Sequence, residues 1–453
     1  MARRSSRAAL AKLPLFEVSI ESLSPEGRGV AHRNGKVIFI DQALPQETVQ
    51  ARYLRRRSKR DEAEAVDILQ PAADRVVPDC PHYGVCGGCR LQHMEATAQL
   101  RFKQTVLLQQ LQHIGRVVPE NIRAPMTGPV WGYRHKARLG VKYVVKKNRL
   151  LVGFRERSKP YIAELDQCKV LHPRVGMLLT PLAELIAGLS NRDQIAQIEV
   201  AIGATEDTES AAGQVVLVLR NLGEFSNADY EQLREFGEQY QLTFMLQPGG
   251  LDSITPLPAA ARPQLYYDLP AHDIRLDFQP FDFTQVNPDI NRQLVDAVCA
   301  WLDLETTDRV LDLFCGLGNF SLPIARQVAQ VTGVEGDENL VARARMNAQK
   351  NNITNAGFIC LDLMAADLEA AFLHERYNKV VIDPPRSGAA DIIVRLPWQG
   401  VEQIAYVSCN PATLARDAGE LVRQHGFRLA ETGVLDMFPH TAHVESLALF
   451  VKQ

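Results

Sequence analysis

Two absences narrow what this 453-residue sequence can encode. No apolar run approaches the roughly 20 residues that a membrane-spanning helix needs, so we expect no membrane partner. Residues 1–12 lack the apolar core of a secretory signal, and we therefore expect a cytoplasmic protein. In that reducing compartment, the eight cysteines indicate metal binding or catalysis rather than disulfides.

A strong net charge is also missing, because the formal net charge is only −3. The charge is nevertheless uneven, since residues 1–60 hold 13 lysines and arginines against 5 aspartates and glutamates. Such a local excess supplies phosphate contacts to a nucleic acid even in a mildly acidic chain. The composition, 46% hydrophobic and 23% charged, is that of a globular protein, and the length predicts about three domains.

The N-terminal part predicts a small RNA-binding β-barrel. Residues 1–14 read as a basic, disordered tail, and residues 15–73 contain short β-type runs punctuated by glycine and proline. Residues 52–60 predict a basic hairpin in which six of nine side chains are cationic, and the aromatic Tyr53 lies between the first two cations. This hairpin suits an RNA backbone, and the alternative is a solvated charged turn.

Residues 74–284 predict a central α+β domain with a metal site. Cys80, Cys86 and Cys89 lie within ten residues, and Cys168 is the best candidate for a fourth ligand. Four thiolates bind zinc or an iron–sulfur cluster equally well, so the spacing leaves both open. We expect His82 and His93, which lie nearby, to be bystanders. The cations of residues 131–139 fit an RNA-facing strand or an ordinary exposed strand equally well.

Residues 285–453 predict a nucleotide-binding α/β domain, in which strand, glycine loop and helix follow one another from Asp308. Gly316 and Gly318 let the backbone approach a ligand, and Glu335 ends the next strand, where an acid holds ribose hydroxyls. The third glycine of the dinucleotide motif is missing. This difference favours S-adenosylmethionine over a dinucleotide.

Three further strands end in Asp362, Asp383 and Cys409. Because the carboxyl ends of parallel strands meet at one edge of a sheet, we expect Asp383 and Cys409 to share a pocket. The rigid Asp-Pro-Pro turn suits a carboxylate that holds an amide N–H of a planar base, and the alternative is a plain turn. Cys409 is a candidate nucleophile, although a packed structural thiol is the commoner role of a cysteine.

Five motifs together resemble the RNA uracil-5-methyltransferases that use S-adenosylmethionine: Asp312-Leu-Phe-Cys-Gly-Leu-Gly-Asn-Phe, Asp383-Pro-Pro-Arg, Ser408-Cys-Asn-Pro, His443-Val-Glu and Phe283-Thr-Gln-Val-Asn. The resemblance covers nearly the whole chain and is closest to the branch that methylates 23S ribosomal RNA. It implies a multidomain α/β protein with an N-terminal TRAM-type barrel and a C-terminal Rossmann-like methyltransferase domain. We expect a monomer.

The resemblance also implies the roles of individual residues. A [4Fe-4S] cluster would be held by Cys80, Cys86, Cys89 and Cys168. The cofactor site would be lined by Gln285, Phe314, Asn319, Glu335, Asp362 and Asp383.

The catalytic roles follow from the chemistry of uracil, whose C5 is too poor a nucleophile to attack a sulfonium directly. A thiolate must first add to C6, and we assign this step to Cys409. A general base must then remove the C5 proton, and we choose Glu445, with His443 as the alternative. Gln285 and Asp383 would orient the ring, and Phe283 would pack on it.

Other functions remain open at this point. A different rRNA or a tRNA could carry the uridine. Methylation of an adenine amino group also uses a Pro-Pro turn but needs no thiol, so Cys409 and Glu445 argue against it. An RNA-binding iron–sulfur protein without catalytic activity would explain the first 170 residues and leave the C-terminal motifs unused.

Overall fold

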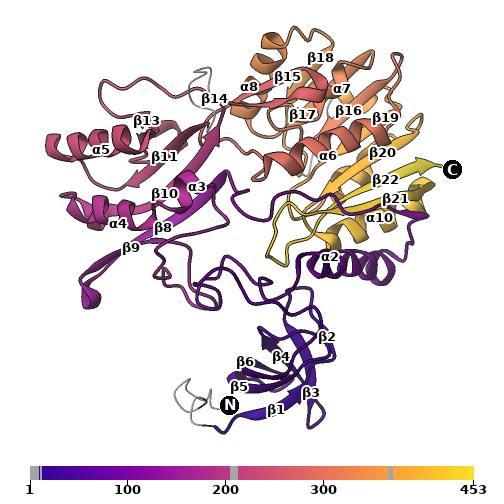
Figure 1. The fold of residues 1–453 in the computed structure, drawn as a ribbon. Helices are drawn as coiled ribbons and strands as arrows, with labels where there is room; N and C mark the ends of the chain where they lie inside the picture. The colour runs from indigo at the N-terminus through magenta and orange to yellow at the C-terminus, as the bar shows by residue number, and fades with distance from the viewer. Residues whose placement is uncertain (1–9, 11–12, 205–212, 366–370) are drawn as a thin grey trace. The chain divides into compact units, whose positions relative to one another are not determined.

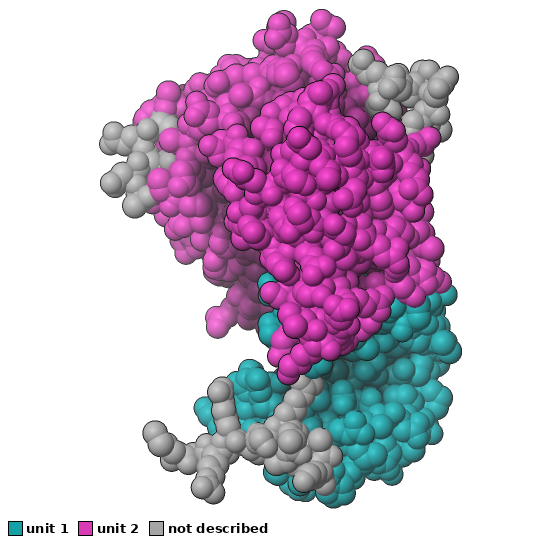
Figure 2. All heavy atoms as spheres, turned by 90° about the vertical axis from the view of Figure 1, so that its left-hand side faces the viewer, with its two compact units in different colours: residues 1–103, 155–160, 438–443 teal, residues 104–154, 161–437, 444–453 magenta. Residues whose placement is uncertain are grey.

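The computed structural model describes residue 10 and residues 13–204, 213–365 and 371–453, so most of the predicted basic tail lies outside the described residues. The chain divides into two compact units, coloured separately in Figure 2. Unit 1 contains residues 1–103, 155–160 and 438–443. Unit 2 contains residues 104–154, 161–437 and 444–453. Each unit is described by itself below.

Unit 1 begins with a six-stranded sheet in the order β1-β5-β6-β4-β3-β2 (Figure 1). Buried and exposed residues alternate along its strands, and the inward-facing apolar residues form one core around Ile38 and Val49. The predicted basic hairpin is confirmed, because β5 ends at Arg56 and β6 begins at Arg60. The strands are β1 (Phe16–Ser19), β2 (Ser22–Leu23), β3 (Gly29–Arg33), β4 (Lys36–Asp41), β5 (Thr48–Arg56) and β6 (Arg60–Gln70).

The first sheet of unit 2 has the order β13-β12-β11-β10-β8-β9. Of the strand pairs described in this sheet, only β11 and β12 are parallel, and α5 (Asn227–Tyr240) connects them. A capping box of Ser226 and Asp229 starts this helix. The strands are β8 (Lys136–Val144), β9 (Arg149–Gly153), β10 (Ile195–Gly203), β11 (Gln214–Asn221), β12 (Leu242–Leu246) and β13 (Thr255–Pro256). The hairpin of β14 (Leu265–Leu269) and β15 (Ile274–Phe278) follows.

The second sheet of unit 2 has eight strands in the order β18-β17-β16-β19-β20-β22-β21-β7. The first five are parallel, β22 is antiparallel to β20 and β21, and β7 (Asn121–Ile122) pairs with β21. The remaining strands are β16 (Arg309–Leu313), β17 (Gln330–Glu335), β18 (Ala356–Cys360), β19 (Lys379–Ile382), β20 (Gln403–Ser408), β21 (Phe427–Leu435) and β22 (Glu445–Lys452).

The central strands of this sheet are buried on both faces, which explains why β19 and β20 read as continuous apolar runs in the sequence. Strand order reverses at β16, whose neighbours are β17 and β19. In open α/β sheets, ligands bind outside the carboxyl ends of the strands at such a reversal. The helices of this region are α6 (Pro288–Trp301), α7 (Ser321–Ala325), α8 (Glu338–Lys350), α9 (Ala390–Arg395) and α10 (Pro411–His425).

Among the described residues, no helix is both long and apolar enough to cross a membrane.

Candidate active site

Strand pairing brings Cys409 and Glu445 to the same edge of the sheet. The parallel strand β20 ends at Ser408, and Cys409 is the next residue. Strand β22 runs the opposite way and begins at Glu445, with Ser446 paired to Ser408. Continuing this register by one residue places Glu445 opposite Cys409. The Ser446 hydroxyl also donates to the Ser408 carbonyl at 3.3 Å.

Helix α10 fixes the loop that carries the thiol. Asn410 caps the helix by accepting from the Ala412 N–H at 3.1 Å, with Pro411 as the first helical residue. Its side-chain amide donates to the Arg386 carbonyl at 3.0 Å. The cap therefore joins the Cys409 loop to the loop that follows Asp383.

A buried acid in α10 anchors the other end of the Asp383 loop. Asp417 accepts from the Tyr406 hydroxyl and from the Ala389 N–H, both at 2.7 Å. Gly388, the residue before Ala389 in this loop, has a φ of 80°. An added Cβ there would lie 2.7 Å from the Asp417 carboxylate. Only glycine fits such a turn without strain. Asp383 and Cys409 are thus held by the same helix.

Burial controls the protonation of this edge. Glu445 is only 4% exposed, and burial together with the charge of Asp383 raises its pKa to about 8. Burial and Glu335 raise the pKa of Asp383 to about 7. The Cys409 thiol also has a raised pKa, first through burial and then through Glu445 and Asp383. Arg386 acts in the opposite direction on the pKa of Cys409 and of Glu445.

The glycine loop after β16 is organised by Glu335, the acid that ends β17. Its carboxylate accepts from the backbone N–H groups of Gly316 at 3.1 Å, Gly336 at 2.8 Å and Asp337 at 3.1 Å. Gly316 has a φ of 55°, and no atom lies within 4 Å of the position that a Cβ would occupy. The loop therefore leaves open space beside an oriented carboxylate, as a nucleoside site requires.

Two predicted cofactor residues, Phe314 and Asn319, make different kinds of contact: one through its backbone and the other through its side chain. Phe314 has a left-handed backbone, with φ 63°, and its N–H donates to the Val334 carbonyl at 2.8 Å. Asn319 exchanges two 3.0 Å hydrogen bonds with Asn291 and accepts another from the Tyr267 hydroxyl at 2.9 Å. The Asn319 amide thus fixes α6 and β14 against the glycine loop.

Two further acids lie at this edge. Asp362 follows β18 and accepts from the Met364 N–H at 2.9 Å, and its backbone lies next to Gly336. Asp312 in β16 opens one of the five sequence motifs, but the sequence did not indicate a functional role for it. It is fully buried, accepts from the Ser321 hydroxyl, and has a pKa that burial raises to about 7. Its place at the penultimate residue of a buried strand was the available signal.

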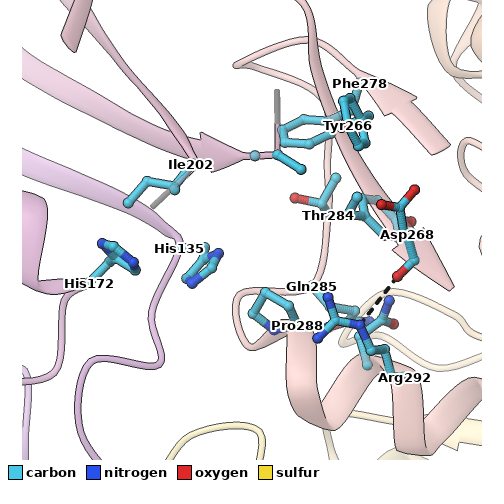
Figure 3. A pocket seen from close by; sticks show the side chains of 15 residues that line it. His135, His172, Ile202, Tyr266, Asp268, Phe278, Thr284, Gln285, Pro288 and Arg292 are labelled. Atoms are coloured by element: carbon cyan, nitrogen blue, oxygen red, sulfur yellow. Dashed lines mark hydrogen bonds between the residues drawn. The ribbon is translucent and has the colours of Figure 1, made fainter. Parts of the chain in front are cut away.

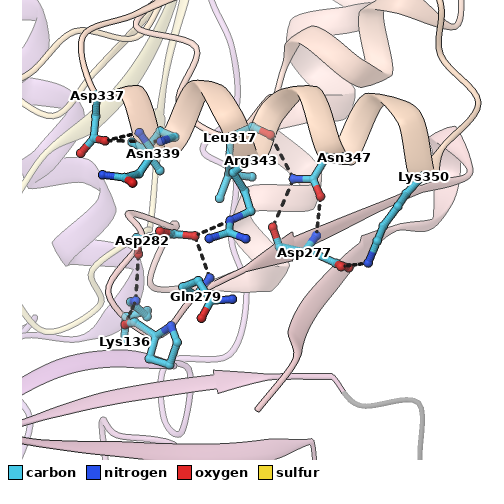
Figure 4. A network of polar contacts seen from close by, with 12 residues as sticks. Lys136, Asp277, Gln279, Asp282, Leu317, Asp337, Asn339, Arg343, Asn347 and Lys350 are labelled. Carbon is cyan, nitrogen blue, oxygen red and sulfur yellow. Dashed lines mark hydrogen bonds and ion pairs between the residues drawn. The ribbon is translucent and has the colours of Figure 1, made fainter. Parts of the chain in front are cut away.

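A polar network holds the segment that presents Phe283 and Gln285 (Figure 4). The buried Asp282 carboxylate accepts from Arg343 Nε of α8 at 3.1 Å, and its carbonyl accepts from Lys136 Nζ of β8 at 2.9 Å. Phe283, the next residue, is 69% exposed. Lys136 is therefore bound within unit 2, and burial lowers its pKa to about 8, which argues against the RNA-facing interpretation for this cation.

The same network reaches the glycine loop. Asn347 of α8 is fully buried and donates to the carbonyls of Leu317 at 3.2 Å and Asp277 at 3.1 Å, while the Asp277 N–H donates back to it at 3.0 Å. Nothing in the local sequence marks Asn347, because its partners lie far away in the chain.

The four cysteines fall in different units. Cys80, Cys86 and Cys89 lie in unit 1, and Cys168 lies in unit 2. The Cys86 sulfur accepts from the Gly88 N–H at 3.4 Å, and the Cys89 carbonyl accepts from Arg157 at 3.0 Å. Within the described ranges, no three His, Cys, Asp or Glu side chains are gathered so that they could hold a metal ion.

His93, expected to be a bystander, lies 2.5 Å from the Tyr83 hydroxyl through its Nδ1. Burial is the largest cause that lowers its pKa, to about 3, so the ring is neutral at pH 7.

The sheet, the glycine loop and the acid that ends β17 define a Rossmann-like nucleoside-binding domain with a thiol at a neighbouring strand end. Comparison with known proteins agrees. A family described as tRNA (Uracil-5-)-methyltransferase matches residues 268–453, and the TRAM domain matches residues 15–57. The solved structure of Pyrococcus abyssi tRNA (uracil-54, C5)-methyltransferase with S-adenosyl-L-homocysteine has a TM-score of 0.71 at 23% identity, covering 96% of this chain and 100% of its own, and shows the fold.

Two curated relatives are named 23S rRNA (uracil(1939)-C(5))-methyltransferase RlmD. The protein of Alkalilimnicola ehrlichii is 49% identical over 97% of both chains, and that of Nitrosococcus oceani is 50% identical over 99% of both. The chain therefore belongs to the RNA uracil-5-methyltransferase family. The predictions of the family, of an enzyme, of an N-terminal TRAM domain and of a C-terminal methyltransferase fold are confirmed. The alternative without catalytic activity is excluded.

Proposed function

We propose that this chain methylates C5 of a uridine in 23S ribosomal RNA with S-adenosylmethionine as methyl donor. The observation that supports this reaction best is the register of β20 and β22, which puts Cys409 opposite Glu445. The choice of 23S rRNA follows the names of the full-length relatives, which are 45–50% identical to the chain. We further propose that it acts in the cytoplasm as a monomer.

The glycine loop fits an adenosyl group. Glu335 is oriented beside the open space at Gly316, and Asp362 lies at the next strand end, so the two acids suit ribose and adenine. Phe314, Asn319, Gln285 and Asp383 complete the proposed site. S-adenosylmethionine supplies an electrophilic methyl group there.

Cys409 opens the proposed reaction. Its thiolate adds to C6 of the uracil, and C5 gains the electron density that it needs to attack the methyl group. Asp383, held by the α10 contacts, accepts a hydrogen bond from the ring N–H. The raised pKa of the Cys409 thiol means that it must lose its proton in the complex, and Arg386 favours that loss.

Glu445 closes the proposed reaction. After methyl transfer, its carboxylate takes the C5 proton, and the Cys409 sulfur leaves C6 as the double bond re-forms. A carboxylate whose pKa lies at about 8 is a stronger base than an exposed one. Both groups lie at one edge, so a single bound ring reaches both.

Purified protein, unmodified 23S rRNA and radiolabelled S-adenosylmethionine test this function directly. Label should enter the RNA as 5-methyluridine at one position. Methylation of tRNA alone, or of an adenine, would contradict the proposed substrate.

We also propose that Cys80, Cys86, Cys89 and Cys168 hold a [4Fe-4S] cluster. Four thiolates are the donors that such clusters use. Gly87 lets the cysteine loop pass close to the Arg155 backbone, because a Cβ at Gly87 would lie 3.0 Å from the Arg155 carbonyl. Protein purified without air should be brown and contain about four irons per chain. One zinc per chain would contradict the cluster.

We propose that the basic hairpin of β5 and β6 contributes phosphate contacts. Removal of residues 1–70 should weaken RNA binding and reduce its dependence on salt, while cofactor binding persists. Equal salt slopes for the full-length and shortened proteins would show that the hairpin is only a solvated surface.

A further inference from the structure

Unit 2 contains a pocket of about 280 Å³ beside Gln285. Residues from β8, β10, β11, α3 (Pro173–Gly176), β14, β15 and α6 or their flanking segments line it. Figure 3 shows His135 and His172 together on one side, with Thr284, Gln285 and Arg292 across from them. Cys409, Asp383, Glu445 and Glu335 are not among its lining residues, all of which the structure describes. The pocket therefore lacks the proposed nucleophile and the acids assigned to the reaction, but it shares Gln285 with the proposed cofactor site.

The size of the pocket limits its occupant. Pockets for drug-sized ligands typically enclose roughly 300–1,000 Å³, so a volume of about 280 Å³ suits one ring system better than a whole nucleoside cofactor. The walls are aromatic. The His135 and His172 rings pack edge to face at 5.0 Å, and Tyr266 and Phe278 contribute two more rings.

The polar groups of the pocket suit a neutral, planar ligand. His172 accepts from the Arg174 N–H, so its other ring nitrogen carries the proton. Burial, then His172 and Arg292, lowers the pKa of His135 to about 4, so this ring is neutral at pH 7. Among the described residues, the side chains of Thr284 and Gln285 make no hydrogen bond within the chain. The Thr284 hydroxyl can read the edge of a base, and the Gln285 amide, which also belongs to the proposed cofactor site, places this pocket next to the reacting groups.

We propose that this pocket takes one unstacked nucleobase of the substrate RNA, next to the uridine that is methylated. The inference rests on the proposed function, because the RNA is its ligand. Single-stranded RNA is read by aromatic rings that stack on splayed bases and by polar groups at their edges, and the pocket supplies both. Arg292, whose side chain is 41% exposed and pairs with Asp289 at 3.0 Å, adds a cation that can contact an RNA phosphate.

The test measures RNA affinity without turnover. A fluorescent 23S rRNA fragment is titrated with protein saturated with S-adenosylhomocysteine. His135→Ala should weaken binding about tenfold, because stacking on one aromatic ring is lost. His135→Phe, which keeps a ring, should restore most of it. His272→Ala is the matched control, since His272 pairs with Asp296 at 2.9 Å and does not line the pocket.

A second comparison identifies the base. Nucleotides near the target uridine are replaced one at a time by an abasic residue. One replacement should weaken binding to wild type about tenfold and add nothing in His135→Ala, because both changes remove the same contact. Losses that simply multiply at every position would overturn the inference. So would weaker binding of S-adenosylhomocysteine by His135→Ala, because the pocket would then belong to the cofactor.

The outcome is separable from that of the proposed function. An RNA that binds but is not methylated would overturn the proposed reaction, whereas the affinity comparison for His135 would still be measurable.

Discussion

Buried acids are paired with cations in the N-terminal sheet of unit 1, whereas the eight-stranded sheet of unit 2 contains both paired and unpaired buried acids. In unit 1, the buried carboxylates of Asp41, Glu47 and Asp61 each have a cationic partner. Arg28 lies 2.9 Å from Asp41 and Lys36 lies 2.7 Å from Asp61, while Arg75 pairs with Glu47. These pairs offset much of the cost of removing a charge from water.

In unit 2, the buried Asp308 also pairs with Lys379 at 2.8 Å, but the equally buried Asp312 and Glu445 have no ion pair within the described residues. Their pKa values are raised to about 7 and about 8 by burial. Folding favours paired or neutral groups in such places, so unpaired acids at strand ends indicate groups kept for chemistry. The difference teaches that burial alone does not mark a catalytic acid, and that a buried acid without a cation at the carboxyl edge of the sheet is the better candidate.

The largest effect should come from the Cys409 thiol, which lies opposite Glu445 in the strand register. Cys409→Ala should abolish methylation and form no covalent protein–RNA adduct, because the proposed addition to C6 cannot occur. Glu445→Gln should keep addition and methyl transfer but stall at proton removal, so methylated RNA stays attached to the protein. A denaturing gel with labelled RNA separates the three proteins.

RNA with 5-fluorouridine is the positive control, since fluorine cannot leave C5 as a cation and wild type should also be trapped. A shifted band in Cys409→Ala would exclude this residue as the nucleophile. Full turnover by Glu445→Gln without an adduct would move the role of base to another residue, such as His443.

The sequence predicted the strands of this sheet well because they are buried on both faces. The runs that end near Glu335, Asp383 and Cys409 are β17, β19 and β20. The pairing of β22 with β20 was not predictable from local pattern, and it is this pairing that places Glu445 opposite Cys409. Glu445 was predicted from the His443-Val-Glu motif and not from its position opposite Cys409.

Other strands and contacts could not be predicted from the sequence, for physical reasons. Strand β6 has charged residues on its exposed face and β2 has only two residues, so neither gives a clear apolar alternation. Asn410 before Pro411 is a readable cap signal. The contacts of Asp417 and Asn347 reach more than twenty residues along the chain, and a single sequence carries no trace of such contacts.

Breaking a pair in unit 1 should have the next largest effect. Arg75→Met leaves the fully buried Glu47 carboxylate without its cation, and we expect unfolding of unit 1 to become easier by about 3–5 kcal/mol. Arg101→Met is the control, because its pair with Asp74 at 2.8 Å is exposed and should contribute less than about 1 kcal/mol. Urea denaturation followed by circular dichroism measures both. Equal losses would show that burial of the pair is irrelevant.

Replacing the buried acid Glu445 of unit 2 should, in contrast, make the folded chain more stable at high pH. The folded Glu445 has its pKa at about 8 against an ordinary 4.5, so the folded chain keeps a proton that the unfolded chain loses between these values. Stability therefore falls as pH rises through that window, by up to about 1.4 kcal/mol per pH unit. Glu445→Gln lacks this loss and should be more stable than wild type at pH 8 but not at pH 4.

Thermal unfolding across this pH range provides the measurement, with exposed Glu402→Gln as the control that should show no such trend. If Glu445→Gln were less stable than wild type at pH 8, the contacts of the ionised carboxylate would stabilise the fold. Its burial would then not reduce the free energy of unfolding.

The smallest effect, and the sharpest comparison, concerns the protonation of Cys409. Glu445 and Asp383 raise the pKa of its thiol, and Arg386 lowers it. Glu445→Gln should therefore let the thiol ionise at lower pH than in wild type, whereas Arg386→Gln should require higher pH. The rate of iodoacetamide labelling of the Cys409 peptide, followed by mass spectrometry from pH 6 to 10, reads this directly because only the thiolate reacts. Cys360 is exposed and serves as the internal control, with one profile in all three proteins. Shifts in the same direction for both variants would show that burial alone sets the thiol, and that the neighbouring acids and Arg386 do not tune it.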